Sequence, residues 1–126
     1  PPDPRFRIYA AVGRFLEQRR HDLPEGAVAA VEIGALGWAT RAPVLDLAGL
    51  VSPAVLAAKA NGTVPQLVAR ERPACLVDAP VFRTLLLGEV LREPRIAASY
   101  RPVAVFETLE YGGGTVRLLC RSDPVP

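Results

Sequence analysis

The chain has 126 residues, of which 50% are hydrophobic and 22% charged, and it carries 15 basic and 13 acidic side chains. This composition excludes an intrinsically disordered segment, and the length fits one domain that buries roughly two thirds of its unfolded surface. The formal net charge of +2 excludes, by charge alone, a nucleic-acid reader. Only the run 19–21 (RRH) is locally basic, and no apolar run approaches the roughly 18 residues that cross a bilayer.

Both ends of the chain are rich in proline, and the sequence contains no methionine. We therefore expect an excised piece of a longer protein. Residues 1–4 and 123–126 are predicted to be linkers, and residues 5–122 a single α/β domain.

The first half of the chain predicts two helices and two strands. Residues 5–21 should form a helix, because Ile8, Val12 and Leu16 recur at helical spacing. The continuous apolar run 27–31 is typical of a strand covered on both faces, and residues 44–47 predict a second strand. Between the strands, residues 34–40 should form one or two helical turns. Ser52-Pro53 is a typical helix start, with Ser as N-cap, and this helix should fade at residues 61–62.

The second half predicts two more helices and three strands. Thr63 should cap a helix that runs through residue 72; a buried strand follows at 73–78 and a helix at 82–91. Residues 103–107 and 116–120 should be strands joined by a flexible hairpin loop at 112–114. This order predicts an α/β fold, a three-layer sandwich with a mainly parallel sheet and an antiparallel C-terminal hairpin at its edge.

Three acids stand where three predicted parallel strands finish: Glu32, Asp46 and Asp78. Ligands gather at the carboxyl ends of strands in open α/β sheets, so these carboxylates could bind a divalent metal or the hydroxyls of a sugar. Acids at such positions also cap the next helix, and Asp78 precedes Ala79-Pro80 as an N-cap would. Capping is the interpretation that we favour.

The segment after the first strand holds three more candidate ligand-binding residues. Gly34 and Gly37 form a Gly-x-x-Gly pair, loosely similar to a phosphate-cradling turn but without the third glycine of the dinucleotide fingerprint. Close packing of the backbone is the simpler reason for both glycines. Trp38 could stack on a sugar ring, although a lone aromatic residue is more often part of a core or its rim.

The two cysteines, Cys75 and Cys120, lie far apart in apolar, strand-like contexts, and His21 is the only histidine. This spacing excludes a zinc site. The default expectation is two buried thiols that act as small hydrophobic side chains. A disulfide would require that the two strands be neighbours and that the compartment be oxidising.

Residues 31–38 (VEIGALGW) and 44–53 (VLDLAGLVSP) carry a family resemblance. They resemble the soluble C-terminal region of bacterial multi-pass membrane glycosyltransferases of the GT-C superfamily, which includes the protein mannosyltransferases and arabinosyltransferases. In that family one strand ends in acid-x-Gly, a Gly-aromatic turn follows, and the next strand ends in Asp-x-x-Gly-Leu. Trp38 stands where a tyrosine is more usual. The resemblance covers about residues 5–80 of this chain.

The resemblance implies a non-catalytic role. Such enzymes take a sugar from a polyprenyl-phosphate donor at the outer face of the membrane, and their catalytic acid lies in a loop that these residues do not include. The implied piece is an extracytoplasmic domain that recognises the acceptor, docks a partner or supports the membrane part. Its implied partners are its own transmembrane domain and a glycan or lipid-linked sugar, with no cofactor and no nucleic acid.

Two other functions are consistent with the residues. One is a small soluble α/β domain that binds a metal or nucleotide through Glu32, Asp46 and Asp78. The other is an interaction module without a ligand, which would expose an apolar patch.

Overall fold

The computed structural model describes residues 4–31, 36, 40–48, 52–83, 86–108 and 114–122, with the backbone alone for residues 4–6 and 108. Its elements are, in chain order, α1 (Pro4–Gln18), β1 (Val28–Ala30), β2 (Val44–Asp46), α3 (Pro53–Asn61), α4 (Val64–Glu71), β3 (Cys75–Asp78), the 3-10 helix η1 (Pro80–Phe82), α5 (Leu86–Arg92), α6 (Pro94–Ser99), β4 (Tyr100–Thr108) and β5 (Gly114–Arg121).

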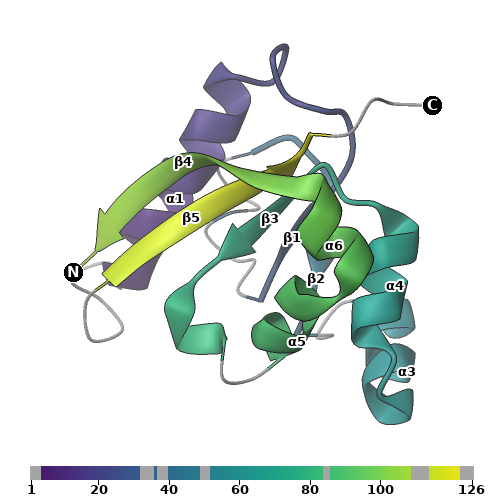
Figure 1. Ribbon diagram of the computed structural model, residues 1–126. Helices are drawn as coiled ribbons and strands as arrows, with labels where there is room; N and C mark the ends of the chain where they lie inside the picture. The colour runs from purple at the N-terminus through teal and green to yellow at the C-terminus, as the bar shows by residue number, and fades with distance from the viewer. Residues whose placement is uncertain are drawn as a thin grey trace.

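The strands form one five-stranded mixed sheet in the order β2-β1-β3-β5-β4 (Figure 1). β1 runs parallel to both β2 and β3, whereas β5 runs antiparallel to β3 and to β4. The predicted α/β class and the antiparallel C-terminal hairpin are therefore confirmed. β5 joins the hairpin to the parallel strands, and β4 forms the outer edge of the sheet.

The core consists of two apolar clusters, one on each face of the sheet. Along β3, Cys75 and Val77 belong to the cluster that includes Val12 and Leu16 of α1. Leu76, between them, belongs to the cluster formed with α3, α4, α5 and α6. Successive strand residues point to opposite faces, so this alternation lets one short strand support both clusters. Figure 1 shows α1 on one side of the sheet and the other helices opposite it.

The helices α3 and α4 begin where the sequence predicts. Ser52 and Thr63 occupy their N-cap positions, each followed by a proline in the first turn, although neither side chain makes a capping hydrogen bond. α3 ends at Gly62 in the left-handed conformation, with φ 69°. The first-turn prolines are already set to the helical φ, so they favour these starts without a side-chain cap.

The predicted helix at 82–91 is wrong in its bounds, and α6 was not predicted. A 3-10 turn covers Pro80–Phe82, α5 spans Leu86–Arg92, and a separate helix follows Glu93. The Glu93 carboxylate accepts the backbone N–H groups of Arg95 and Ile96, at 2.7 and 3.3 Å. This cap starts a new helix at Pro94, and glutamate is not among the usual N-cap residues that a sequence pattern signals.

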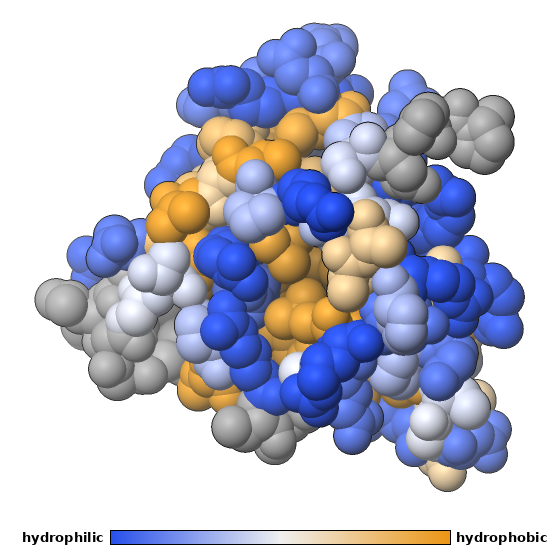
Figure 2. Space-filling view, viewed as in Figure 1, coloured by the Kyte–Doolittle hydropathy of each residue, from blue (hydrophilic) through white to orange (hydrophobic). Residues whose placement is uncertain are grey.

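β4 begins at Tyr100, earlier than predicted, and carries an irregularity between Pro102 and Ala104. Proline is tolerated at an edge strand because its missing N–H leaves no interior ladder bond unmade. Val103 and Val105 of this strand are 44% and 57% exposed. Figure 2 shows apolar surface at the centre of the face seen in Figure 1, ringed by hydrophilic side chains.

Cys75 and Cys120 form a disulfide, so the expectation of two buried thiols is wrong. The two residues are directly opposite in the β3–β5 ladder, with their Cα atoms 4.0 Å apart. The Arg121 N–H donates to the Ala74 carbonyl beside them. The cysteines therefore occupy a non-hydrogen-bonded pair, the closer of the two antiparallel pairings. Their separation of 45 residues gave no sign that the strands are neighbours.

Within the described part of the chain, no helix has the combination of length and apolar character that crossing a bilayer requires.

Candidate functional site

The structure places two of the six predicted ligand-binding residues, Asp46 and Asp78. They end β2 and β3, the two strands that flank β1 in the sheet. The other four, Glu32, Gly34, Gly37 and Trp38, lie outside the described residues, as does most of the predicted turn at 34–40.

Asp78 is fully buried and holds two arginines. Arg83 Nε donates to Oδ1 at 2.8 Å and its Nη2 to Oδ2 at 2.5 Å. Arg117 donates from Nε and Nη2 to Oδ2, at 2.9 and 2.7 Å. Burial raises the pKa of Asp78, but the hydrogen bonds from Arg83 and then Arg117 outweigh it, so that the pKa lies below its usual value. The capping prediction for Asp78 is wrong, because Ala79 holds the N-cap position of η1.

Asp46 is also buried, at 1% exposure, and its Oδ1 accepts the backbone N–H of Ala48 at 3.0 Å. This short-range bond stabilises the turn that leaves β2. Both placed acids therefore have internal structural partners. Among the described residues, no group of three His, Cys, Asp or Glu side chains is arranged to hold a metal ion.

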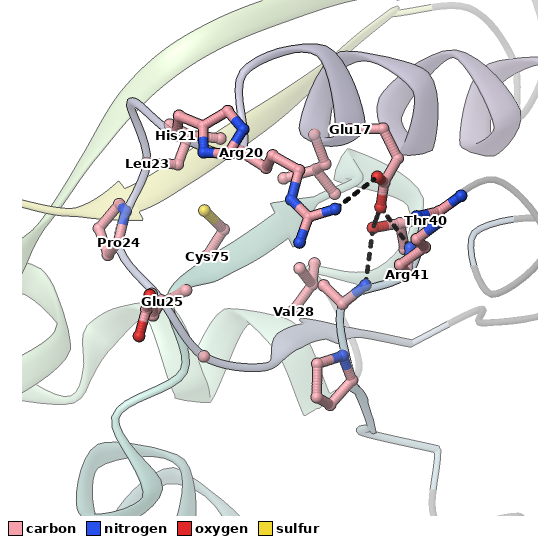
Figure 3. A pocket seen from close by; sticks show the side chains of 15 residues that line it. Glu17, Arg20, His21, Leu23, Pro24, Glu25, Val28, Thr40, Arg41 and Cys75 are labelled. Carbon is pink, nitrogen blue, oxygen red and sulfur yellow. Dashed lines mark hydrogen bonds and ion pairs between the residues drawn. The ribbon is translucent and has the colours of Figure 1, made fainter.

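The opposite edge of the sheet, where β1 and β3 begin, contains a pocket of about 360 Å³ that we call the amino-edge pocket (Figure 3). The end of α1, the loop before β1, the loop before β2 and the start of β3 form its wall. Its apolar lining includes Leu16, Leu23, Val28 and Cys75, and its polar lining includes Glu17, Arg20, His21, Glu25, Thr40 and Arg41.

Gly26 lets the loop before β1 pass close to β3. Its φ is +135°, a conformation that L side chains rarely adopt. A Cβ built there would lie 3.3 Å from the backbone N of Ala74, which itself donates to the Ala27 carbonyl. The loop is thus fixed against the start of β3, and this contact forms one wall of the amino-edge pocket.

Glu17 joins α1 to the loop before β2. Its Oε1 accepts the Thr40 hydroxyl at 3.1 Å and the backbone N–H of Arg41, and its Oε2 lies 3.8 Å from Arg20 Nη1. The Thr40 hydroxyl in turn accepts the N–H of Ala42 at 3.1 Å (Figure 3). The Arg41 N–H is the main cause that lowers the pKa of Glu17, against the opposing effect of burial. Glu17 therefore stays ionised and positions the loop that carries Arg41.

The amino-edge pocket combines an apolar floor with a polar rim that bears both signs of charge. Pockets of this size that bury an apolar surface and offer a few placed polar groups are typical of small-molecule sites. Arg20, His21 and Arg41 can donate hydrogen bonds, and Glu25 can accept them. The sequence does not predict this pocket, because the candidate residues lie at the carboxyl ends of the strands, whereas the pocket lies where β1 and β3 begin. The locally basic run 19–21, followed by a turn, was the available signal.

These features define a small mixed α/β domain with a pocket at one edge of its sheet. The chain belongs to the family described as Domain of unknown function (DUF8728), whose model matches residues 3–122. No curated protein and no solved structure matches the chain.

Proposed function

We propose that this chain is a non-catalytic extracytoplasmic domain of a membrane glycosyltransferase that uses a polyprenyl-phosphate sugar donor. In this proposal the domain recognises the acceptor glycan at the amino-edge pocket and is attached to the transmembrane part of the same protein. Its partners are that transmembrane part and the glycan or lipid-linked sugar. We further propose that α1, the sheet and the helices α3–α6 are the layers of a three-layer sandwich, since each face of the sheet packs against helices.

The disulfide between Cys75 and Cys120 is the observation that carries the placement outside the cytoplasm. Disulfides form and persist in oxidising compartments and are rare where glutathione and thioredoxin keep thiols reduced. Both cysteines are buried, which suits a structural bond rather than an exposed redox-active pair. The bond therefore supports the extracytoplasmic side that the family resemblance implies.

The amino-edge pocket supports the role in acceptor recognition. A sugar presents C–H groups on its ring faces and hydroxyls around its edge, so it needs an apolar surface beside donors and acceptors. Leu16, Leu23 and Val28 on the floor supply the apolar surface. Arg41 and Glu25 on the rim supply a hydrogen-bond donor and an acceptor.

The placement is tested by trapping thiols in cells that make the complete parent protein. Acid quenching followed by a mass-tagged maleimide should add no tag to this domain unless a reductant is applied first, and two tags afterwards. The Cys75→Ala variant is the matched control and should take one tag without reductant. Two tags without reduction would overturn the placement, as would a parent gene that encodes no series of hydrophobic spans.

The binding role is tested separately by amide NMR. Titration with soluble mono- and oligosaccharides should shift the signals of Glu17, Gly26 and Arg41 in a saturable manner. The Arg41→Glu variant should weaken the response, whereas Arg14→Glu, an exposed substitution on α1 away from the pocket, should not. Absence of saturable shifts at these positions would remove acceptor recognition and leave only support of the membrane part.

A further inference from the structure

A second hollow lies at the same edge of the sheet, on the side of α4 and α6. We call it the arginine hollow; its volume is about 490 Å³. Of the nine described residues that line it, four are arginines: Arg70, Arg72, Arg95 and Arg121. None of the described residues that line it is acidic.

The four arginines come from three separate segments of the chain. Arg70 and Arg72 are at the end of α4, Arg95 is in α6, and Arg121 ends β5. Figure 1 shows these three segments meeting beside the start of β3. The Arg95 guanidinium is ion-paired with Glu93 at 3.0 Å. The like charges that converge on the hollow otherwise repel one another, and an anion bound among them would turn this repulsion into attraction.

Hydrogen bonds fix the wall of the arginine hollow before any ligand binds. Arg95 Nε donates to Glu93 Oε1 at 3.0 Å, and Arg121 Nη1 donates to the Arg72 carbonyl at 2.6 Å. The Ser99 carbonyl accepts both the N–H and the hydroxyl of Ser122, at 2.8 and 3.0 Å. The ends of α4, α6 and β5 are thereby tied together. A preorganised wall lowers the cost of ordering side chains when a ligand binds.

We propose that the arginine hollow binds a ligand through a phosphate or diphosphate group. The planar guanidinium donates two parallel hydrogen bonds to phosphate oxygens, so several arginines suit a multiply charged anion better than a single carboxylate. The volume is in the range of small-molecule sites, and it leaves room for the group esterified to the phosphate. Ile96 and Ala98 offer apolar contact to that group.

This site goes beyond the function proposed above, because it is a different hollow, would bind a phosphate group rather than the acceptor glycan assigned to the amino-edge pocket, and does not depend on the compartment. The two hollows are nevertheless neighbours. Arg121 Nη2 donates to the carbonyl of Glu25, which lines the amino-edge pocket, at 3.3 Å.

Titration calorimetry of the chain with sodium diphosphate tests the proposal. Saturable binding is expected, weakening as salt is added. The Arg70→Glu/Arg95→Glu variant should bind at least about tenfold more weakly, a loss of about 1.4 kcal/mol or more. The matched control is Arg7→Glu/Arg14→Glu, which makes the same change of net charge at exposed positions on α1 and should keep the affinity within about twofold.

The Arg70→Lys/Arg95→Lys variant keeps the charge and removes the guanidinium fork, so it should lie between the wild type and the charge reversal. It also keeps the test decisive if the charge reversal does not fold. Absence of saturable diphosphate binding to the wild type would overturn the proposal. Equal losses in the α1 control would do so too, because binding would then follow net charge alone.

Two further experiments identify the source of the phosphate group. Competition by a soluble hexose phosphate would indicate a free metabolite. Co-sedimentation with phosphatidylcholine vesicles that contain phosphatidic acid, reversed by free diphosphate and lost in the charge reversal, would indicate a lipid headgroup. Vesicle binding that neither diphosphate nor the charge reversal reduces would count against the hollow, since it would reflect only general attraction to an anionic surface.

Discussion

The two edges of the sheet use their charged side chains in opposite ways. At the carboxyl edge, where β2 and β3 end, Asp78 is buried beneath Arg83 and Arg117. Asp46 at the same edge accepts a hydrogen bond from the adjacent turn. At the amino edge, charged side chains such as Arg20 and Arg41 line an open pocket.

The difference shows that the position of an acid in a fold does not determine its role. The edge where α/β proteins usually bind ligands here holds acids that stabilise the fold, at least where the structure describes it. This contrast can be tested first at the disulfide that joins β3 to β5 and then at the charged residues of each edge.

Removal of the disulfide should have the largest effect. The Cys75→Ala/Cys120→Ala variant releases a loop closed over 45 residues, and the chain-entropy relation assigns about 4 kcal/mol to such a loop. Urea unfolding at neutral pH measures the loss in the free energy of unfolding. Reductant should lower the stability of the wild type toward that of the variant and leave the variant unchanged. A wild type that does not respond to full reduction would contradict the assignment.

The Asp78→Asn variant should lose about 2–3 kcal/mol, because it leaves two guanidiniums opposite a neutral amide in a buried position. The two arginines are 43% and 38% exposed, so water offsets part of the penalty. Urea unfolding at neutral pH is the measurement. Asp22→Asn, an exposed position, is the control and should change stability little.

The Asp78 carboxylate should also make the free energy of unfolding depend on pH in the acid range. Its pKa in the folded state is lowered, so its contribution is complete above the unfolded value of about 3.9 and is lost as the pH falls through the lower folded value. Wild-type stability should therefore fall more steeply than that of Asp78→Asn below about pH 4. If the stability of the two proteins fell equally with pH, the ion pairs of Asp78 would contribute nothing to the free energy of unfolding.

Much of this fold is predictable from local sequence signals. The helical spacing of Ile8, Val12 and Leu16 predicts α1, and Ser52-Pro53 predicts the start of α3. These signals succeed because helices and short buried strands depend on residues that are near one another in the chain.

The features that the sequence does not predict depend on contacts between segments that are distant in the chain. Asp78 meets Arg117 across 39 residues only because β5 pairs with β3, and the same pairing brings Cys75 opposite Cys120. No spacing rule within a single sequence fixes which strands are neighbours. The amino-edge pocket likewise joins α1 to loops that arrive from elsewhere in the chain.

The Asp46→Ala variant tests whether the second acid at the carboxyl edge is structural. It removes the acceptor of the Ala48 N–H, and a loss of about 1 kcal/mol is expected in urea unfolding. Asp46→Asn keeps an oxygen that can accept this bond and should lose less. A binding residue behaves differently: its removal leaves stability unchanged or raised. An increase in stability would therefore indicate that Asp46 is a ligand-binding residue rather than a structural one.

The smallest effect on stability is expected from Glu17→Gln at the amino edge, because the side chain is partly exposed and the amide oxygen can still accept the two hydrogen bonds that Oε1 accepts. The informative readout is the Arg41 amide signal in NMR. In the wild type this signal should move as the pH falls through the lowered pKa of Glu17, below the usual value of about 4.3, because the carboxylate that accepts its N–H becomes neutral.

In Glu17→Gln the Arg41 signal should stay constant over the same range, whereas Glu71→Gln, an exposed position on α4, should leave the wild-type curve unaltered. A titrating Arg41 signal in Glu17→Gln would mean that another acid holds the loop. A constant signal, together with near wild-type stability, would mean that the charge of Glu17 positions the pocket rim while contributing little to the fold. That is the opposite of the balance expected at Asp78, where the ion pairs stabilise the fold.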